Sequence, residues 1–220
     1  MTTTSDRRGP PNGRRVDLAR RRFGRRSLGA LLLISGPPGW LIGCDSKQKP
    51  SFRNTDITGA EFARDFALTG QDGKPRSLAD FKGKVVVMFF GYTQCPDVCP
   101  TTMVEMAEVM KQLGADADRV QVLFVTVDPE RDTRQLLSQY VPAFDKRFLG
   151  LYGDAEATAK VAKEFKIFYK KVPGNSPTSY TVDHSAGSYV FDKQGKVRLF
   201  VRHGQGAEVL AKDLKTLLDQ

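Results

Sequence analysis

Two cysteines four positions apart, Cys95 and Cys99, are the residues of this chain best suited to chemistry, and each is followed by a proline. Pro96 disfavours helical geometry at Cys95, and Pro100 does so at Cys99 while supplying a preset first residue for a following helix. We therefore expect a turn that folds the two sulfurs toward each other. Cys99 would lie beside the positive end of that helix, which lowers a thiol pKa and favours the thiolate that binds metals or attacks disulfides. The alternative is a pair of structural cysteines in the core.

The element that positions the cysteines is a strand expected at residues 85–90. This run is continuously apolar, β-branched and aromatic, which is typical of a strand covered on both faces, and Gly91 ends it. The cysteines then follow the carboxyl end of a central strand, where open α/β sheets usually bind ligands. The next helix carries Met103, Met106 and Met110 at helical spacing. This spacing favours packing in the core over copper binding by the methionines.

The remaining hydrophobic patterns predict an α/β domain. A strand entering a turn is expected at 66–74 and a short helical step at 77–81. Further strands are expected at 120–127, 148–152, 189–191 and 197–201, helices at 133–140, 155–165 and 207–218, and a long loop at 167–182. The order is β-α-β-α-β-α-β-β-α with one antiparallel hairpin. It predicts a thioredoxin-like three-layer fold with a central mixed sheet and an N-terminal extension.

The net charge of +9 is concentrated in the first 43 residues, which hold nine arginines and two aspartates. From Cys44 onward, 25 basic residues nearly balance 23 acidic ones. The basic excess therefore belongs to a leader, and a nucleic-acid-binding domain is excluded.

Residues 1–43 have the three parts of an export signal: an arginine-rich region, an apolar run at 28–42 and a small residue before Cys44. Residues 41–44 resemble a bacterial lipobox, in which the cysteine is diacylated and becomes the first residue of the mature protein. Residues 20–23 also resemble part of a twin-arginine signal. The alternative is an uncleaved anchor, but the apolar run is short and is interrupted by the sequence GPPG at 36–39, which favours cleavage.

These features predict three parts: an export signal at 1–43, a membrane tether at 44–56 and a folded domain at 57–220. The domain is expected on the extracytoplasmic, periplasmic side of a bacterial cytoplasmic membrane, anchored by lipid or by the signal. Asp45, next to the expected lipidated Cys44, resembles an inner-membrane retention signal. Lipidation of Cys44 leaves one cysteine pair, which in an oxidising compartment can close a disulfide or hold a soft metal.

A third ligand is expected from one of the two histidines. His184 precedes a strand expected to run antiparallel to the central strand, so that it starts at the edge where the parallel strands end. It can therefore lie beside the cysteines, and Asp183 could orient its ring. Asp128, after the strand at 120–127, is expected to cap a helix or to support the site from the same edge. His203 is expected to be a loop residue facing solvent.

Two thiolates and one imidazole form a soft site with three protein ligands. That donor set suits Cu(I), and it can hold Cu(II) if a further ligand or water joins. A structural zinc ion would normally require a fourth protein ligand.

Three segments together resemble the Sco/SenC family of copper-binding thioredoxin-fold proteins, which are associated with cytochrome c oxidase assembly. They are FGYTQCPDVCPTT at 90–102, VDPERDT at 127–133 and DHS at 183–185, within a match over 66–218. The resemblance implies copper held by Cys95, Cys99 and His184 in a metallochaperone, and it leaves open whether the protein also has thiol-disulfide reductase activity. It also implies delivery to, or reduction of, the dinuclear copper site of oxidase subunit II, with a periplasmic copper donor and a thioredoxin-like reductant as further partners. Gln94 stands where many members carry histidine.

Two other functions compete with copper delivery. An exported thiol-disulfide oxidoreductase or redox sensor could use Cys95 and Cys99, although three residues separate them where the usual motif has two. Such chemistry has no necessary role for His184. A thiol peroxidase would act through a sulfenate at one cysteine.

Overall fold

The computed structural model describes residues 50–176 and 179–220. The expected export signal, Cys44 and residues 45–49 of the expected tether lie outside the described residues. The end of that tether, at residues 53–56, is attached to the domain. Asp213 accepts hydrogen bonds from the backbone N–H groups of Arg53 and Asn54, and Thr55 and Asp56 pair with a strand of the main sheet.

Eight strands form the main sheet, in the order β1-β10-β9-β4-β5-β6-β2-β3. Their bounds are β1 (Thr55–Asp56), β2 (Leu68–Gly70), β3 (Pro75–Arg76), β4 (Val85–Gly91), β5 (Val120–Thr126), β6 (Leu149–Tyr152), β9 (Ser188–Phe191) and β10 (Val197–Val201). The expected central strand is β4, and all seven of its residues are buried. It pairs in parallel with β5 and antiparallel with β9, so the sheet is mixed.

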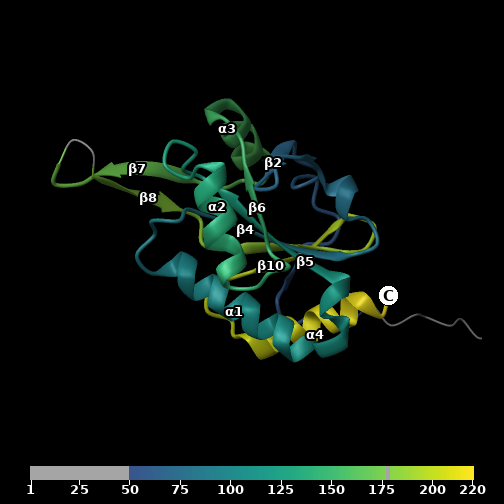
Figure 1. Cartoon of the computed structure of the whole chain (residues 1–220). Coiled ribbons are helices and arrows are strands. Elements are labelled where there is room, and N and C mark those ends of the chain that lie inside the picture. Colours follow the sequence, from purple (N-terminus) through teal and green to yellow (C-terminus); the bar gives the residue numbers. More distant parts are fainter. Residues whose placement is uncertain (1–49, 177–178) are drawn as a thin grey trace, which may run out of the picture. The chain divides into compact units, whose positions relative to one another are not determined.

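Among the described residues, four α-helices cover the sheet: α1 (Val98–Leu113), α2 (Arg134–Tyr140), α3 (Ala155–Glu164) and α4 (Ala207–Leu218). Helices α1 and α4 pack together on one side of the sheet, and α3 lies on the other side (Figure 1). Phe165, just after α3, packs against Phe90 of β4 and Phe191 of β9. The methionines of α1 are buried in the core, as their spacing predicts. The three layers confirm the expected thioredoxin-like fold.

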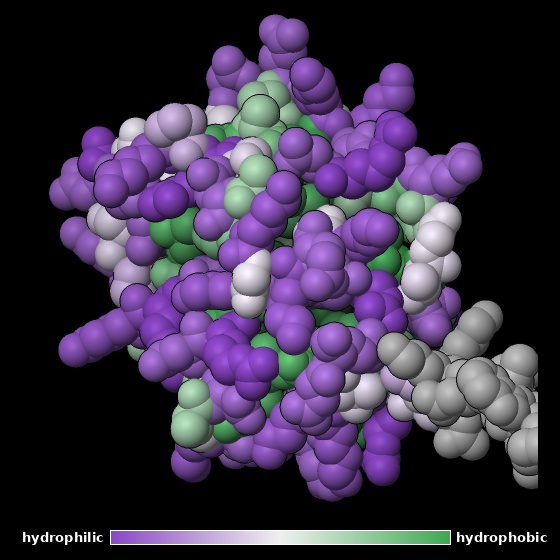
Figure 2. All heavy atoms as spheres, turned by 90° about the vertical axis from the view of Figure 1, so that its right-hand side faces the viewer, coloured by the Kyte–Doolittle hydropathy of each residue, from purple (hydrophilic) through white to green (hydrophobic). Residues whose placement is uncertain are grey.

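Short 3-10 helices link these elements: η1 (Leu78–Phe81), η2 (Gly114–Arg119) and η3 (Val141–Ala143). The first confirms the helical step expected at 77–81. The face on the right-hand side of Figure 1 is mostly hydrophilic, with small apolar areas between polar side chains (Figure 2). None of the helices in the described part of the chain has both the length and the apolar character needed to cross a membrane.

The register of the sheet places three chain segments at one edge. Gly91, at the end of β4, pairs with Thr126, at the end of β5. Ser188, at the start of β9, pairs with Phe89 near the end of β4. The segment that precedes β9 therefore reaches the edge that carries the cysteines, as the topology predicted.

The loop expected at 167–182 is instead largely a β-hairpin. Strands β7 (Tyr169–Pro173) and β8 (Tyr180–His184) form a separate two-stranded sheet, with His184 opposite Tyr169. The hairpin extends from the body of the molecule (Figure 1). Its lysines and prolines obscured the strand pattern in the sequence, because an exposed two-stranded sheet tolerates both residue types.

Candidate metal centre

The turn between β4 and α1 brings the two sulfurs together. Cys99 is completely buried, whereas Cys95 is only partly buried. Both thiols are free, and the backbone N–H of Cys99 donates a hydrogen bond to Cys95 Sγ at 3.5 Å. The helix begins at Val98, so Cys99 lies in its first turn and Pro100 is its third residue rather than its first. The expected turn is therefore present, but the helix begins two residues earlier than predicted.

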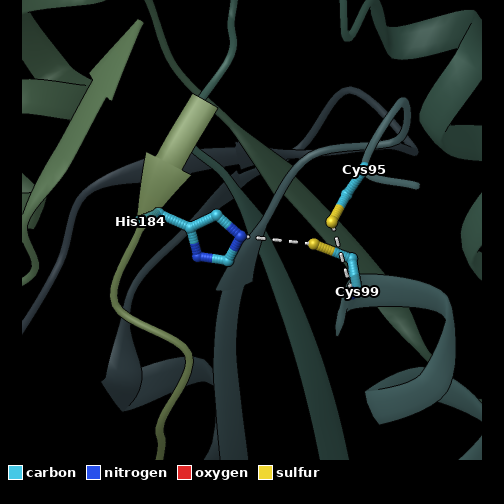
Figure 3. A group of neighbouring side chains, drawn as sticks. All are labelled: Cys95, Cys99 and His184. Atoms are coloured by element: carbon cyan, nitrogen blue, oxygen red, sulfur yellow. Dashed lines mark hydrogen bonds between the residues drawn. The ribbon is translucent and has the colours of Figure 1, made fainter. Parts of the chain in front are cut away.

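His184, the last residue of β8, directs its ring at the sulfurs (Figure 3). Its Nε2 atom lies 3.4 Å from Cys99 Sγ, although 85 positions separate the two residues. One ligand atom from each of Cys95, Cys99 and His184 lies within 4.8 Å of the other two. The structure thus brings together the three residues that the sequence selected as ligands.

The hydrogen bond on the far side of the His184 ring sets its tautomer. Nδ1 lies 2.9 Å from the backbone carbonyl oxygen of Ser185, which can only accept a hydrogen bond. We therefore assign the hydrogen to Nδ1, so that the Nε2 lone pair points toward the sulfurs. Phe89 and Tyr92 pack edge-on against the ring, at centroid distances of 6.3 and 5.9 Å. The ring is held in the orientation that coordination through Nε2 requires.

Burial controls the protonation of two of the three groups. It raises the pKa of the Cys99 thiol well above its usual value, so the expected lowering by the helix end is wrong. Loss of solvent around a completely buried thiolate outweighs the partial charge of the helix terminus. Burial also lowers the pKa of His184. The imidazole is therefore neutral near pH 7, and Cys99 must release its proton when a metal binds.

Asp128 does not cap α2, because Thr133 does so by accepting a hydrogen bond from the Leu136 N–H at 3.2 Å. Asp128 is instead fully buried, and each of its carboxylate oxygens accepts a hydrogen bond from a different side chain. Arg131 donates to Oδ2, and the Tyr180 hydroxyl donates to Oδ1 at 2.8 Å. The expected capping role is therefore wrong, and the expected supporting role of Asp128 near the site stays a prediction.

Asp132 fixes the start of the cysteine loop, and the sequence analysis did not single it out. Its carboxylate accepts hydrogen bonds from the backbone N–H of Thr93 at 3.0 Å, from Thr93 Oγ1 at 2.6 Å and from Thr126 Oγ1 at 2.6 Å. It is almost completely buried, which raises its pKa. Its position in the segment that follows β5, at the edge that carries the cysteines, was the signal that could have identified it.

Asp183 and His203 lie at the periphery of the centre. Asp183 is exposed, and the described partner of His184 Nδ1 is the Ser185 carbonyl rather than the Asp183 carboxylate. His203 is exposed, as expected, and its Nδ1 atom lies 3.1 Å from Thr102 Oγ1 in α1.

The donor set of the centre is two sulfurs and one imidazole nitrogen. Soft thiolates with an imidazole favour Cu(I), and three protein ligands leave room for a further one. The centre therefore fits a soft metal ion with an open coordination position better than the closed four-ligand shell of structural zinc.

Comparison with known proteins places this geometry in a family. The SCO1/SenC family profile matches residues 54–219. A mouse mitochondrial SCO2 homologue is 36% identical over 153 residues, which are 69% of this chain and 60% of the mouse protein. This chain thus matches less than two thirds of that relative's length.

The chain also resembles solved structures of the same family. The copper-bound ScoI of Bradyrhizobium japonicum is 41% identical, covers 71% of this chain and 99% of its own, and has a TM-score of 0.67. A SCO1/SenC family lipoprotein from Bacillus anthracis is 29% identical, covers 76% of this chain and 99% of its own, and has a TM-score of 0.63. The expected cofactor, copper, is confirmed at the level of the family. The match over most of the described domain, together with the Cys-Cys-His group, shows that this chain belongs to the SCO1/SenC family.

Proposed function

We propose that this protein is a copper metallochaperone for cytochrome c oxidase. It binds one copper ion through Cys95 Sγ, Cys99 Sγ and His184 Nε2, and it delivers that ion to the dinuclear copper site of oxidase subunit II. The observation that carries the proposal is the convergence of these three ligand atoms within 4.8 Å of one another. A thiol pair alone would not need a neutral imidazole directed at it.

The geometry supports transfer as well as binding. Cys99 and His184 are held by a helix and a packed ring, whereas Cys95 lies in a loop and is partly exposed. An acceptor thiol or imidazole can therefore enter beside Cys95 and replace it as a ligand. Copper would then leave by ligand exchange while the other two ligands stay in place.

The binding test compares Cu(I) affinity and stoichiometry among four variants of the full-length protein, by competition with a chromophoric chelator. Cys95→Ala, Cys99→Ala and His184→Ala are each expected to weaken copper binding. His203→Ala is the matched control, because it removes the other histidine and is expected to bind copper like the wild type. Unchanged affinity and stoichiometry in all three ligand variants would contradict the proposal.

The delivery test uses the copper-binding domain of an oxidase subunit II as acceptor. Copper-loaded wild-type protein is expected to generate the absorption of the dinuclear site, and the Cys95→Ala variant is expected to fail. Binding without transfer to this acceptor would leave the copper site standing and would rule out the delivery step. A periplasmic copper donor and a thioredoxin-like reductant are the further partners we propose, because loading needs the reduced dithiol.

We also propose that the domain is tethered to the extracytoplasmic face of the cytoplasmic membrane by lipid on Cys44. The lipobox-like sequence before Cys44 supports this, as does a family relative from Bacillus anthracis that is itself a lipoprotein. Mass spectrometry of the mature N-terminal peptide tests it. A peptide that begins at diacylated Cys44 is expected, and Cys44→Ala should release the domain from the membrane fraction. An unmodified Cys44 in membrane-bound protein would contradict lipid anchoring.

A thiol-disulfide reductase is the second candidate, because both thiols are free and their sulfurs lie within 4.8 Å. In this reaction the Cys95–Cys99 dithiol becomes a disulfide and passes two electrons and two protons to the partner disulfide, which becomes a dithiol. Turnover on a disulfide substrate that is unaffected by His184→Ala would favour this function. Loss of copper binding in the same variant, without loss of turnover, would show that the two activities are separable.

A further inference from the structure

We propose that Arg131 is a positioning residue for the metal centre, which holds the His184-bearing strand β8 against the cysteine loop. The inference rests on the proposed copper site. Arg131 acts with Asp128 and Tyr180, and these three residues are called the arginine clamp below. None of the three is among the proposed ligands.

The need for a clamp follows from the origin of the ligands. Cys95 and Cys99 are attached to the central strand of the main sheet, whereas His184 ends a strand of the separate β7–β8 hairpin. The register of the main sheet brings the end of β8 to this edge, but no hydrogen bond within that sheet holds β8 itself at its distance from the sulfurs. Other contacts between the hairpin and the body of the domain must do so.

Arg131 joins three segments of the chain at once. Its Nε donates to the buried Asp128 carboxylate after β5. Its Nη1 donates to the backbone carbonyl of Tyr180 in β8 at 2.9 Å, and to Gln94 Oε1, next to Cys95, at 3.2 Å. A planar guanidinium can make these divergent bonds simultaneously, and a lysine ammonium on a flexible stem cannot reproduce them.

The Tyr180 side chain closes the clamp from the hairpin side. The guanidinium carbon of Arg131 lies 3.6 Å from the centroid of the Tyr180 ring, and the Tyr180 hydroxyl donates to Asp128 Oδ1 at 2.8 Å. The same guanidinium carbon lies 5.7 Å from the ring of Tyr92, which packs against His184. Stacking and charge-assisted hydrogen bonds thus act together at a partly desolvated position.

Strand geometry connects the clamp to the ligand. Tyr180 and His184 are four positions apart in β8, so their side chains lie on the same face of the strand. The burial pattern agrees, because Tyr180, Val182 and His184 are less exposed than Thr181 and Asp183. A strand held at Tyr180 therefore presents His184 toward the sulfurs, and a strand released there can move away from them.

The test measures copper binding by the full-length protein carrying Arg131→Lys, which keeps the positive charge beside buried Asp128. We expect Cu(I) affinity to fall about tenfold, and the sulfur-to-copper absorption and electron paramagnetic resonance of the Cu(II) form to shift toward those of His184→Ala. The matched control is Arg134→Lys. Arg134 bonds to the backbone carbonyls of Gln71 and Asp72, and this control is expected to retain wild-type affinity and spectra.

A double-mutant cycle separates positioning from general destabilisation. If Arg131 acts through His184, Arg131→Lys should cause little further loss of copper affinity in a His184→Ala background. Equal losses with and without His184 would overturn the inference, as would wild-type affinity in Arg131→Lys. If the wild type itself binds no copper, the proposed function fails and the inference fails with it. If the wild type binds copper and Arg131→Lys binds it equally well, the inference fails but the proposed function stands.

Two further measurements test the inference even if Arg131→Lys folds poorly. Tyr180→Phe removes only the hydroxyl bond to Asp128 and leaves the stacked ring, so it should fold and should weaken copper binding in the same direction, by a smaller factor. Hydrogen exchange of the β8 backbone amides before copper is added should be faster in both clamp variants than in Arg134→Lys. Unchanged exchange in β8 in both clamp variants would contradict the inference.

Discussion

Gly91 leaves the space that the Cys99 sulfur occupies, because a Cβ atom on Gly91 would lie 2.9 Å from Cys99 Sγ. The same Cβ would lie 2.8 Å from the ring of Phe89 and 3.1 Å from that of Phe124. Both rings are completely buried and belong to neighbouring strands of the central sheet. Both the Cys99 sulfur and the Phe89 ring must therefore shift if this glycine gains a side chain.

Gly91→Ala is accordingly expected to destabilise the fold by about 1–3 kcal/mol, as overpacking does, and to weaken Cu(I) binding by displacing Cys99 Sγ. Denaturant unfolding and chelator competition measure the two effects. Gly153→Ala is the control, since its Cβ would crowd Ala157 and Leu68 instead of a sulfur. The control should lose stability without losing copper affinity. Unaltered copper affinity in Gly91→Ala would show that the close approach is not needed for binding.

The two thiols are expected to differ in reactivity. Cys99 is completely buried and its thiol pKa is raised by that burial, whereas Cys95 is partly exposed. Because the thiolate is the nucleophile, iodoacetamide should alkylate Cys95 of the folded, copper-free protein well before Cys99. Peptide mapping by mass spectrometry reads each site separately. In denaturant the two should react at similar rates. Equal rates in the folded protein would contradict the structure's placement of Cys99.

Much of this centre follows from local sequence pattern. The apolar run of β4 and the prolines around the cysteines identified a strand followed by a turn, and strand order brought His184 to the same edge. These inferences need only residue type, periodicity and topology. The elements predicted in this way are present in the structure, with small differences at their ends.

The features of the site that the sequence did not reveal depend on how deeply a side chain is buried and on contacts between residues far apart in the chain. The pKa of Cys99 is set by complete burial, which a helix-end argument does not measure. The bond between Tyr180 and Asp128 joins residues 52 positions apart, and no periodic pattern reports it. The strands of the β7–β8 hairpin were hidden because exposed strands need no apolar face.

Asp132→Asn is expected to loosen the cysteine loop. The carboxylate accepts hydrogen bonds from Thr93 and Thr126, and an amide cannot accept from all these donors with its single oxygen. Leaving one buried donor unsatisfied costs about 1–3 kcal/mol. Denaturant unfolding at pH 7 measures the loss. Asp118→Asn, at an exposed position, is the control and should have wild-type stability.

The stability difference between wild type and Asp132→Asn is expected to depend on pH in one direction. Burial raises the pKa of Asp132 in the folded state, whereas in the unfolded chain this carboxyl has its ordinary pKa of about 4. The folded protein therefore binds the proton more tightly, so this group adds stability as the pH falls from 7 through its folded-state pKa. Asparagine does not titrate. The stability gap between wild type and Asp132→Asn should widen between pH 7 and about 4. A gap that narrows over this range would contradict the raised pKa.

Asp213 is expected to anchor the chain where it enters the domain. This buried carboxylate of α4 accepts hydrogen bonds from the backbone N–H groups of Arg53 and Asn54 and from Asn54 Nδ2. Asp213→Ala leaves these donors without their acceptor and should lower the free energy of unfolding by about 2 kcal/mol. Faster tryptic cleavage after Arg53 should accompany that loss.

The hydrogen bonds of Asp213 are expected to have no role in copper binding, because they go to residues 53 and 54 and to none of the proposed ligands. Copper affinity of Asp213→Ala should therefore match the wild type at a temperature where both are folded. Asp219→Ala, one turn or more further along the chain, is the control for cleavage and should leave Arg53 protected. If Asp213→Ala kept Arg53 equally protected, pairing of β1 with β10 alone would suffice to fasten the start of the domain. If it also lost copper, the entry segment and the metal centre would be coupled through α4 and its neighbour α1, against the separation that the contacts indicate.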